Sequence, residues 1–132
     1  MITIFDLREL CTERKEAGAK TIELSLGEYQ KIKKNASICE DICKLHDKYT
    51  KAYTEIHSLN LKLANEYRVS HFSSKKLKLF TKGLLTEQKI KEDLADIEKD
   101  LKVTLNAYET LKGNNIVIDI NGIKMSIENI DL

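Results

Sequence analysis

The sequence predicts a mainly α-helical protein, in which a long antiparallel helical hairpin forms a coiled-coil stalk and carries a small α/β head. Two long segments keep apolar residues at alternating spacings of four and three residues, which is the pattern of a coiled-coil seam. Strand-like segments lie before the first of them and after the second. The chain has only five glycines and no proline, so we expect a few long elements rather than many short ones.

The first long helix is expected from Leu26 to about Val69. Ser25 can cap it, because Glu28 follows three residues later and completes a Ser-x-x-Glu capping box. The apolar seam of this helix keeps its spacing for more than three heptads, which chance rarely produces. The seam residues are Ile38, Ile42, Leu45, Tyr49, Ala52, Ile56, Leu59 and Leu63.

The second long helix is expected over about Lys75–Lys112. It follows a break at residues 70–74, with Ser74 as its cap and Gly113 as its stop. Two helices of similar length joined by a short loop form an antiparallel hairpin, so the segments that flank them meet at one end. The second seam consists of Ile90, Leu94, Ile97, Leu101, Thr104, Tyr108 and Leu111.

The head begins with a short amphipathic helix over about Ile4–Ala17. Thr3 can cap this helix, and Gly18 stands where a helix C-terminus favours glycine. Thr21–Ser25 then alternates apolar and polar residues, as a half-buried strand does.

The chain ends in a β-hairpin whose turn is Asn121-Gly122, the pair typical of a type I′ turn. We expect this hairpin and the first strand to form a three-stranded sheet with the N-terminal helix on one face. The whole chain is then a single elongated domain over residues 1–132. Residues 1–25 and 113–132 form the head, residues 26–112 form the stalk, and the tip lies near residues 70–75.

The stalk is expected to self-associate as a homodimer. A two-helix stalk cannot shield a whole seam of Ile and Leu by itself, and its opposite flank carries Leu61, Leu84 and Leu105. The residues expected at the oligomer seam are Ile42, Leu45, Tyr49, Ile56, Leu59, Leu63, Ile90, Leu94, Ile97, Leu101 and Tyr108.

The tip of the stalk is the most asymmetric region in charge, because no acidic residue occurs from Tyr67 to Thr86. Its basic and aromatic side chains could grip a phosphate backbone, stack on a base or dock on an acidic protein surface. The alternative is a solubilising loop whose apolar residues close the end of the hairpin. The candidate binding residues are Arg68, His71, Phe72, Lys75, Lys76, Lys78 and Lys82.

A metal site is a minor hypothesis for Cys39, Cys43 and His46, which share one side of a helix. The alternative is that both cysteines are small residues beside the seam and His46 is solvated. His57 is expected to face outward. The chain shows no nucleophile motif, glycine-rich phosphate loop or His-Glu-x-x-His pattern, so we expect neither an enzyme nor a bound cofactor.

Composition narrows the class of protein without naming a partner. Lysine and arginine total 22 and aspartate and glutamate total 21, which argues against a uniformly basic nucleic-acid coat. Charged residues interrupt the N-terminal segment, and no apolar run approaches the length of a membrane span. The cysteine count of three is odd, which fits a reducing compartment better than a disulfide framework. We therefore expect a cytoplasmic protein with no membrane partner.

The function expected from these features is protein–protein interaction without catalysis. The basic residues are mostly lysine, and isoleucine and asparagine are frequent, as in AT-rich coding sequences. This bias is typical of low-GC bacteria and their phages, so the chain could be a small phage or mobile-element inhibitor or regulator of another protein. The alternative is a nucleic-acid-binding accessory or regulatory protein that uses the lysine-rich tip.

Overall fold

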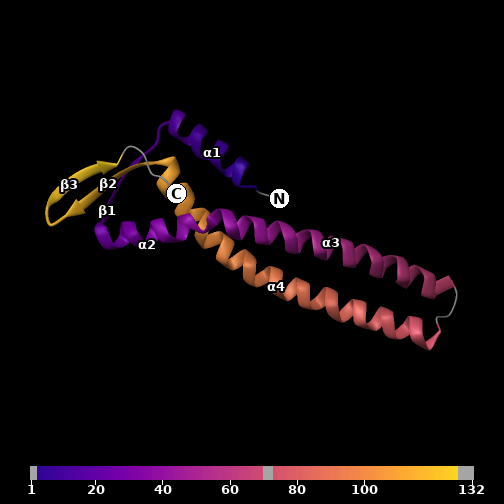
Figure 1. Ribbon diagram of the computed structural model, residues 1–132. Helices are drawn as coiled ribbons and strands as arrows, with labels where there is room; N and C mark the ends of the chain where they lie inside the picture. The colour runs from indigo at the N-terminus through magenta and orange to yellow at the C-terminus, as the bar shows by residue number, and fades with distance from the viewer. Residues whose placement is uncertain (1–2, 70–72, 128–132) are drawn as a thin grey trace. The chain divides into compact units, whose positions relative to one another are not determined.

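The computed structural model describes residues 3–69 and 73–127 and confirms the predicted fold class (Figure 1). The protein is mainly helical, with a helical hairpin and a small three-stranded sheet. The elements in chain order are α1 (Ile4–Glu16), β1 (Thr21–Ser25), α2 (Leu26–Ser37), α3 (Cys39–Val69), α4 (Ser74–Gly113), β2 (Asn115–Ile120) and β3 (Ile123–Ile127).

The chain divides into two compact units, which are described separately. The mixed unit contains residues 1–44 and 99–132, and therefore holds α1, α2, the sheet, the start of α3 and the end of α4. The hairpin unit contains residues 45–98, which are the greater part of α3 and of α4. The single elongated domain expected from the sequence stays a prediction.

The sheet of the mixed unit has the order β1-β2-β3, so the central strand is β2. β1 pairs with β2 in parallel, with Ile22 opposite Ile116, and β2 pairs with β3 antiparallel, with Ile118 opposite Met125. A parallel pair needs a long crossover connection, and the helices between β1 and β2 provide it. The predicted three-stranded sheet is therefore confirmed.

The helix that lies closest to the sheet is α2, which is near both β1 and β2. The N-terminal helix, which the sequence analysis placed on the sheet, instead makes its polar contacts with α3 and α4 through Arg8 and Arg14. The reason is local, because Ser25 caps α2 directly after β1 by accepting a hydrogen bond from the Glu28 amide at 3.2 Å. This immediate reversal lays α2 next to the strand that precedes it.

The structure confirms three predictions made from local sequence signals: a helix cap, a helix end and a turn. Thr3 caps α1 in a reciprocal capping box with Asp6, at 3.1 Å in both directions. Gly18 follows that helix with φ of 113°. Asn121 and Gly122 both have positive φ, 52° and 87°, as a type I′ turn requires.

The long helices differ from their predicted limits at three places. Helix 26–69 is interrupted at Ile38, next to Ser37, whose hydroxyl donates to the Lys34 carbonyl at 2.7 Å; such back-bonding bends helices. Ser73 rather than Ser74 caps α4, because the Ser73 hydroxyl accepts from the Lys76 amide. Gly113 is the last residue of α4 instead of following it.

The apolar core of the mixed unit contains buried side chains from α1, β1, α2, α3, α4 and β2. Leu111, Ile116 and Cys39 are its largest fully buried side chains. The buried apolar residues are Leu7, Cys11, Leu24, Ala36, Cys39, Cys43, Leu101, Ala107, Tyr108, Leu111, Ile116 and Ile118. All of them belong to the mixed unit.

Candidate interaction surfaces

A row of polar side chains connects α3 to α4 in the hairpin unit. His57 Nδ1 lies 2.9 Å from Glu87 Oε1, and His46 Nε2 lies 3.5 Å from Glu98 Oε1. The Asn60 amide donates to the Gly83 carbonyl at 3.0 Å. His46, His57 and Asn60 each come one position after a residue of the predicted apolar seam. Their contacts show that these positions of α3 face α4.

Within this row, Asn60 packs directly against the backbone of Gly83. Asn60 is 4% exposed, and a Cβ added to Gly83 would lie 2.5 Å from Asn60 Oδ1. The Asn60 Nδ2 atom also lies 3.4 Å from Glu87 Oε1, so this amide holds both a backbone carbonyl and a carboxylate. Gly83 is therefore required for packing, and its place inside a helical pattern was the sequence signal that could have revealed it.

His57 does not face outward, so that prediction is wrong. Its ring stacks on Tyr53 with centroids 5.6 Å apart and planes at 10°, and its Nδ1 contacts Glu87. The periodicity of apolar residues carried no information about this position, because the side chain that fills it is polar.

The apolar seam of α3 is only partly covered within the hairpin unit. Leu59 is 51% exposed and Leu45 is 38% exposed, and Tyr49, Ile56 and Leu63 are half-buried. On α4, Ile90, Leu94 and Ile97 are also half-buried. Leu101 and Tyr108 continue that seam in the mixed unit, where both are buried.

A shallow groove joins the α3 seam to the exposed face of α4. It has a volume of about 420 Å³ and is lined by Tyr49, Lys82, Leu85, Thr86, Lys89, Ile90 and Asp93. Tyr49 comes from α3 and the other lining residues come from α4, so the two helices border one common side. We call this the seam side of the hairpin unit: Leu45, Tyr49, Ala52, Ile56, Leu59 and Leu63 of α3, with the groove residues of α4.

The basic tip residues lie partly on a second groove, of about 440 Å³, which is lined by Ser73, Lys75, Lys76, Lys78, Leu79 and Lys82. Lys75, Lys78 and Lys82 are exposed, whereas Lys76 is half-buried and pairs with Glu66. Arg68 is exposed. His71 and Phe72 lie outside the described residues. The structure therefore brings together four of the seven predicted tip residues.

The mixed unit has its own cleft, of about 420 Å³, between α1 and the helices near it. Arg8 crosses this cleft, because its Nε donates to the Tyr108 hydroxyl at 3.2 Å and its guanidinium lies 3.7 Å from Glu40. The hydrogen bond to Tyr108 raises the pKa of Arg8, while burial raises the pKa of the Tyr108 phenol. Neither group is a nucleophile or a base in these states, so the contact is structural.

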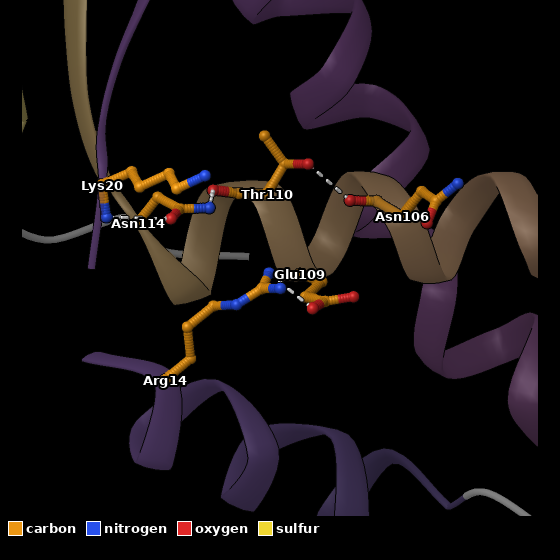
Figure 2. A network of polar contacts seen from close by, with 6 residues as sticks. All are labelled: Arg14, Lys20, Asn106, Glu109, Thr110 and Asn114. Atoms are coloured by element: carbon orange, nitrogen blue, oxygen red, sulfur yellow. Dashed lines mark hydrogen bonds and ion pairs between the residues drawn. The ribbon is translucent and has the colours of Figure 1, made fainter. Parts of the chain in front are cut away.

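The end of α4 is tied to the rest of the mixed unit by polar contacts (Figure 2). Arg14 of α1 pairs with Glu109 at 2.5 Å. Asn114 accepts from the Lys20 amide and donates to the Thr110 carbonyl, both at 3.3 Å. Asn114 thus links the segment before β1 to the end of α4, next to the register pair Thr21 and Asn115.

The three cysteines are all buried in the mixed unit. Burial raises the pKa of Cys39 to about 12, with the neighbouring Cys43 adding to the shift, and burial also raises the pKa of Cys11. Thiols in this state are poor nucleophiles and poor metal ligands. Among the described residues no group of three or more His, Cys, Asp or Glu side chains is arranged to hold a metal ion.

No family model matches the chain, and neither a curated protein nor a solved structure matches it. Within residues 3–69 and 73–127, none of the helices combines the length and the apolar character that crossing a membrane requires.

Proposed function

We propose that this protein is a non-enzymatic interaction module that self-associates through the seam side of its hairpin unit. One observation carries the proposal. Among the described residues of the hairpin unit, Asn60 alone is buried, although α3 carries a six-residue apolar seam at coiled-coil spacing. A helical hairpin without an apolar core gains stability when a second surface covers that seam.

The two broad sides of the hairpin unit offer a matched test of this proposal. Leu59 and Leu61 are both leucines of α3 with nearly equal exposure, 51% and 54%. Two residues apart on a helix they point in nearly opposite directions, so Leu59 belongs to the seam side and Leu61 does not. Replacing each leucine by glutamate therefore makes the same chemical change on opposite faces of α3.

The experiment measures molar mass by light scattering after size-exclusion chromatography. We expect the unmodified chain to elute as a dimer, Leu59→Glu to elute as a monomer, and Leu61→Glu to remain dimeric. A monomeric unmodified chain, or equal effects of the two substitutions, would contradict self-association through this side.

A second candidate function is binding of nucleic acid by the tip, and one observation favours it. Lys75, Lys78 and Lys82 line a groove with Leu79 in a stretch that has no acidic residue between Tyr67 and Thr86. Lysines that neutralise phosphates release counterions, so affinity for duplex DNA should fall steeply as salt rises.

The test compares two double charge reversals of equal net charge. K78E/K82E should abolish salt-dependent binding to duplex DNA, whereas K31E/K34E, on exposed lysines of α2, should not. Binding that survives K78E/K82E would remove the tip from this candidate function.

From the AT-rich composition we also propose that the partner is a cytoplasmic protein of a bacterial host. This chain is then a phage or mobile-element product that regulates the host protein. A tagged chain that retains one host protein at stoichiometric amounts after nuclease treatment would support this regulator role. Retention of no protein would contradict it.

A further inference from the structure

The exposed face of α4 in the hairpin unit changes its charge at its middle. Lys75, Lys78 and Lys82 are exposed in the first half; in the second half the exposed Lys89 is followed by the half-buried Asp93 and the exposed Asp96. On an α-helix of 3.6 residues per turn these lysines and aspartates fall within about 60° of arc. The midpoint between Lys82 and Asp93, like that between Lys78 and Asp96, lies at Glu87 or directly after it.

The apolar seam of α3 has its centre at nearly the same height. It runs from Leu45 to Leu63 and is centred at Thr54. The contact between His57 and Glu87 places Ile56 beside the charge midpoint of α4. The centre of the seam and the charge midpoint therefore differ by only about 4 Å along the hairpin, at 1.5 Å per residue.

The apolar seam of α3 and the charge pattern of α4 are thus centred within one helical turn of each other, and both lie on the seam side. The groove that joins Tyr49 to Lys82 and Asp93 shows that the apolar and the charged rows border each other. A surface that is self-complementary about a central point is what a two-fold symmetric interface requires.

We propose that a second copy of this chain docks antiparallel on the seam side, with the two-fold axis passing beside Ile56. This inference rests on the proposed self-association and specifies its geometry. Each α3 seam then covers the other, with Ile56 against the Ile56 of the second copy. Lys82 lies opposite the Asp93 of the second copy, and Lys78 lies opposite its Asp96.

The charges select this orientation over the parallel one. In an antiparallel pair the basic half of each α4 lies against the acidic half of the other, and complementary charges fix the register. In a parallel pair of hairpins the lysines of both copies gather at one end, where they repel each other. The apolar seam alone would permit either orientation.

The first test measures the distance between nitroxide labels attached at Lys75→Cys in both copies. Lys75 is exposed, and labelling of the unmodified chain controls for Cys11, Cys39 and Cys43, which are buried. The antiparallel pair places the two labelled positions about 40 Å apart along the helices. A parallel pair places them within about 20 Å.

The outcomes separate this inference from the function on which it rests. A dimer with the long distance supports both. A dimer with the short distance overturns the antiparallel geometry and leaves self-association in place. A monomer overturns both.

The second test exchanges the charges in the two halves of α4. K78E/K82E and D93K/D96K should each weaken dimerisation at least tenfold, because each places like charges opposite one another. The chain with all four substitutions restores opposite charges and should recover the original dissociation constant within about threefold. Failure of the four-fold variant to recover, with the control K31E/K34E unchanged, would contradict the proposed register.

Discussion

The mixed unit and the hairpin unit stabilise themselves in opposite ways. All the buried apolar side chains belong to the mixed unit, while the buried residue of the hairpin unit, within the described ranges, is the polar Asn60. Leu7 and Ile116 show that elements from both ends of the chain share one apolar core. Burial of apolar area is the dominant favourable term in folding, so this core is the main stabilising feature of the mixed unit.

The hairpin unit instead joins its helices by hydrogen bonds and ion pairs. His57 with Glu87 and Asn60 with Gly83 specify which residues face each other, but exposed ion pairs contribute little net stability. Its apolar seam is only partly covered within that unit. This difference shows that heptad spacing identifies the apolar face of a helix. It does not identify whether the surface that covers this face belongs to the same chain.

The largest effect expected from a substitution lies in the mixed unit. Leu111→Ala should lower the free energy of unfolding by about 3 kcal/mol, because it leaves a cavity at a side chain that is 1% exposed. The matched control is Leu10→Ala on the exposed face of α1, which should change it by less than about 0.5 kcal/mol. Urea titration followed by circular dichroism measures both, and equal effects would show that the proposed core is wrong.

The next effect tests the polar contact row of the hairpin unit. Gly83→Ala should lower the free energy of unfolding by about 1–2 kcal/mol, since its Cβ displaces Asn60 from two hydrogen bonds. Gly27→Ala is the control, because its Cβ meets nothing within 4 Å and alanine favours a helix by about 0.5–1 kcal/mol. A stabilising Gly83→Ala would show that the helices are not in close contact there.

A smaller effect concerns pH and belongs to the mixed unit alone. The unfolded chain ionises the Cys39 thiol near its ordinary pKa of 9.0, whereas burial keeps the folded thiol protonated to about 12. The unfolded state therefore loses this proton first, and stability falls as pH rises above about 9. We expect a loss of about 1 kcal/mol between pH 8 and pH 9.5.

The measurement is thermal unfolding of the unmodified chain and of Cys39→Ala at both pH values. Cys39→Ala should show less alkaline destabilisation, although its stability at pH 8 is lower because a buried side chain is shortened. Equal pH dependence in the two chains would place the alkaline transition on another group.

The smallest effect concerns the rate at which the buried thiols of the mixed unit react, and whether a substitution on the hairpin unit changes that rate. Cys11 and Cys39 should react with an aromatic disulfide reagent only when the mixed unit opens, so the rate should rise with urea. Leu59→Glu, which changes the hairpin unit alone, should leave that rate nearly unchanged. Fast labelling without denaturant would show that the thiols are accessible.

The fold was predictable where one residue type determines local geometry. Thr3, Ser25 and Asn121-Gly122 act through hydrogen bonds or φ angles within a few residues, and the sequence carries such signals directly. The position of α2 beside the sheet, and the interruption at Ile38, depend on packing and back-bonding that periodicity does not record.

The candidate surfaces were predictable only in part, for the same reason. Apolar spacing identified the α3 seam, but the row that contacts α4 consists of His46, His57 and Asn60, which such spacing does not detect. Lys75, Lys78 and Lys82 were found because a stretch without acids is visible in the sequence. Their role, and that of the seam, stays a prediction.

The measurement that tests the central claim most directly is sedimentation equilibrium of the unmodified chain over a wide concentration range. Self-association through the hairpin unit predicts a mass that rises with concentration to twice the 15.2 kDa of one chain and then stays constant. A mass of one chain at every concentration would contradict it, because the apolar seam would then remain exposed in solution.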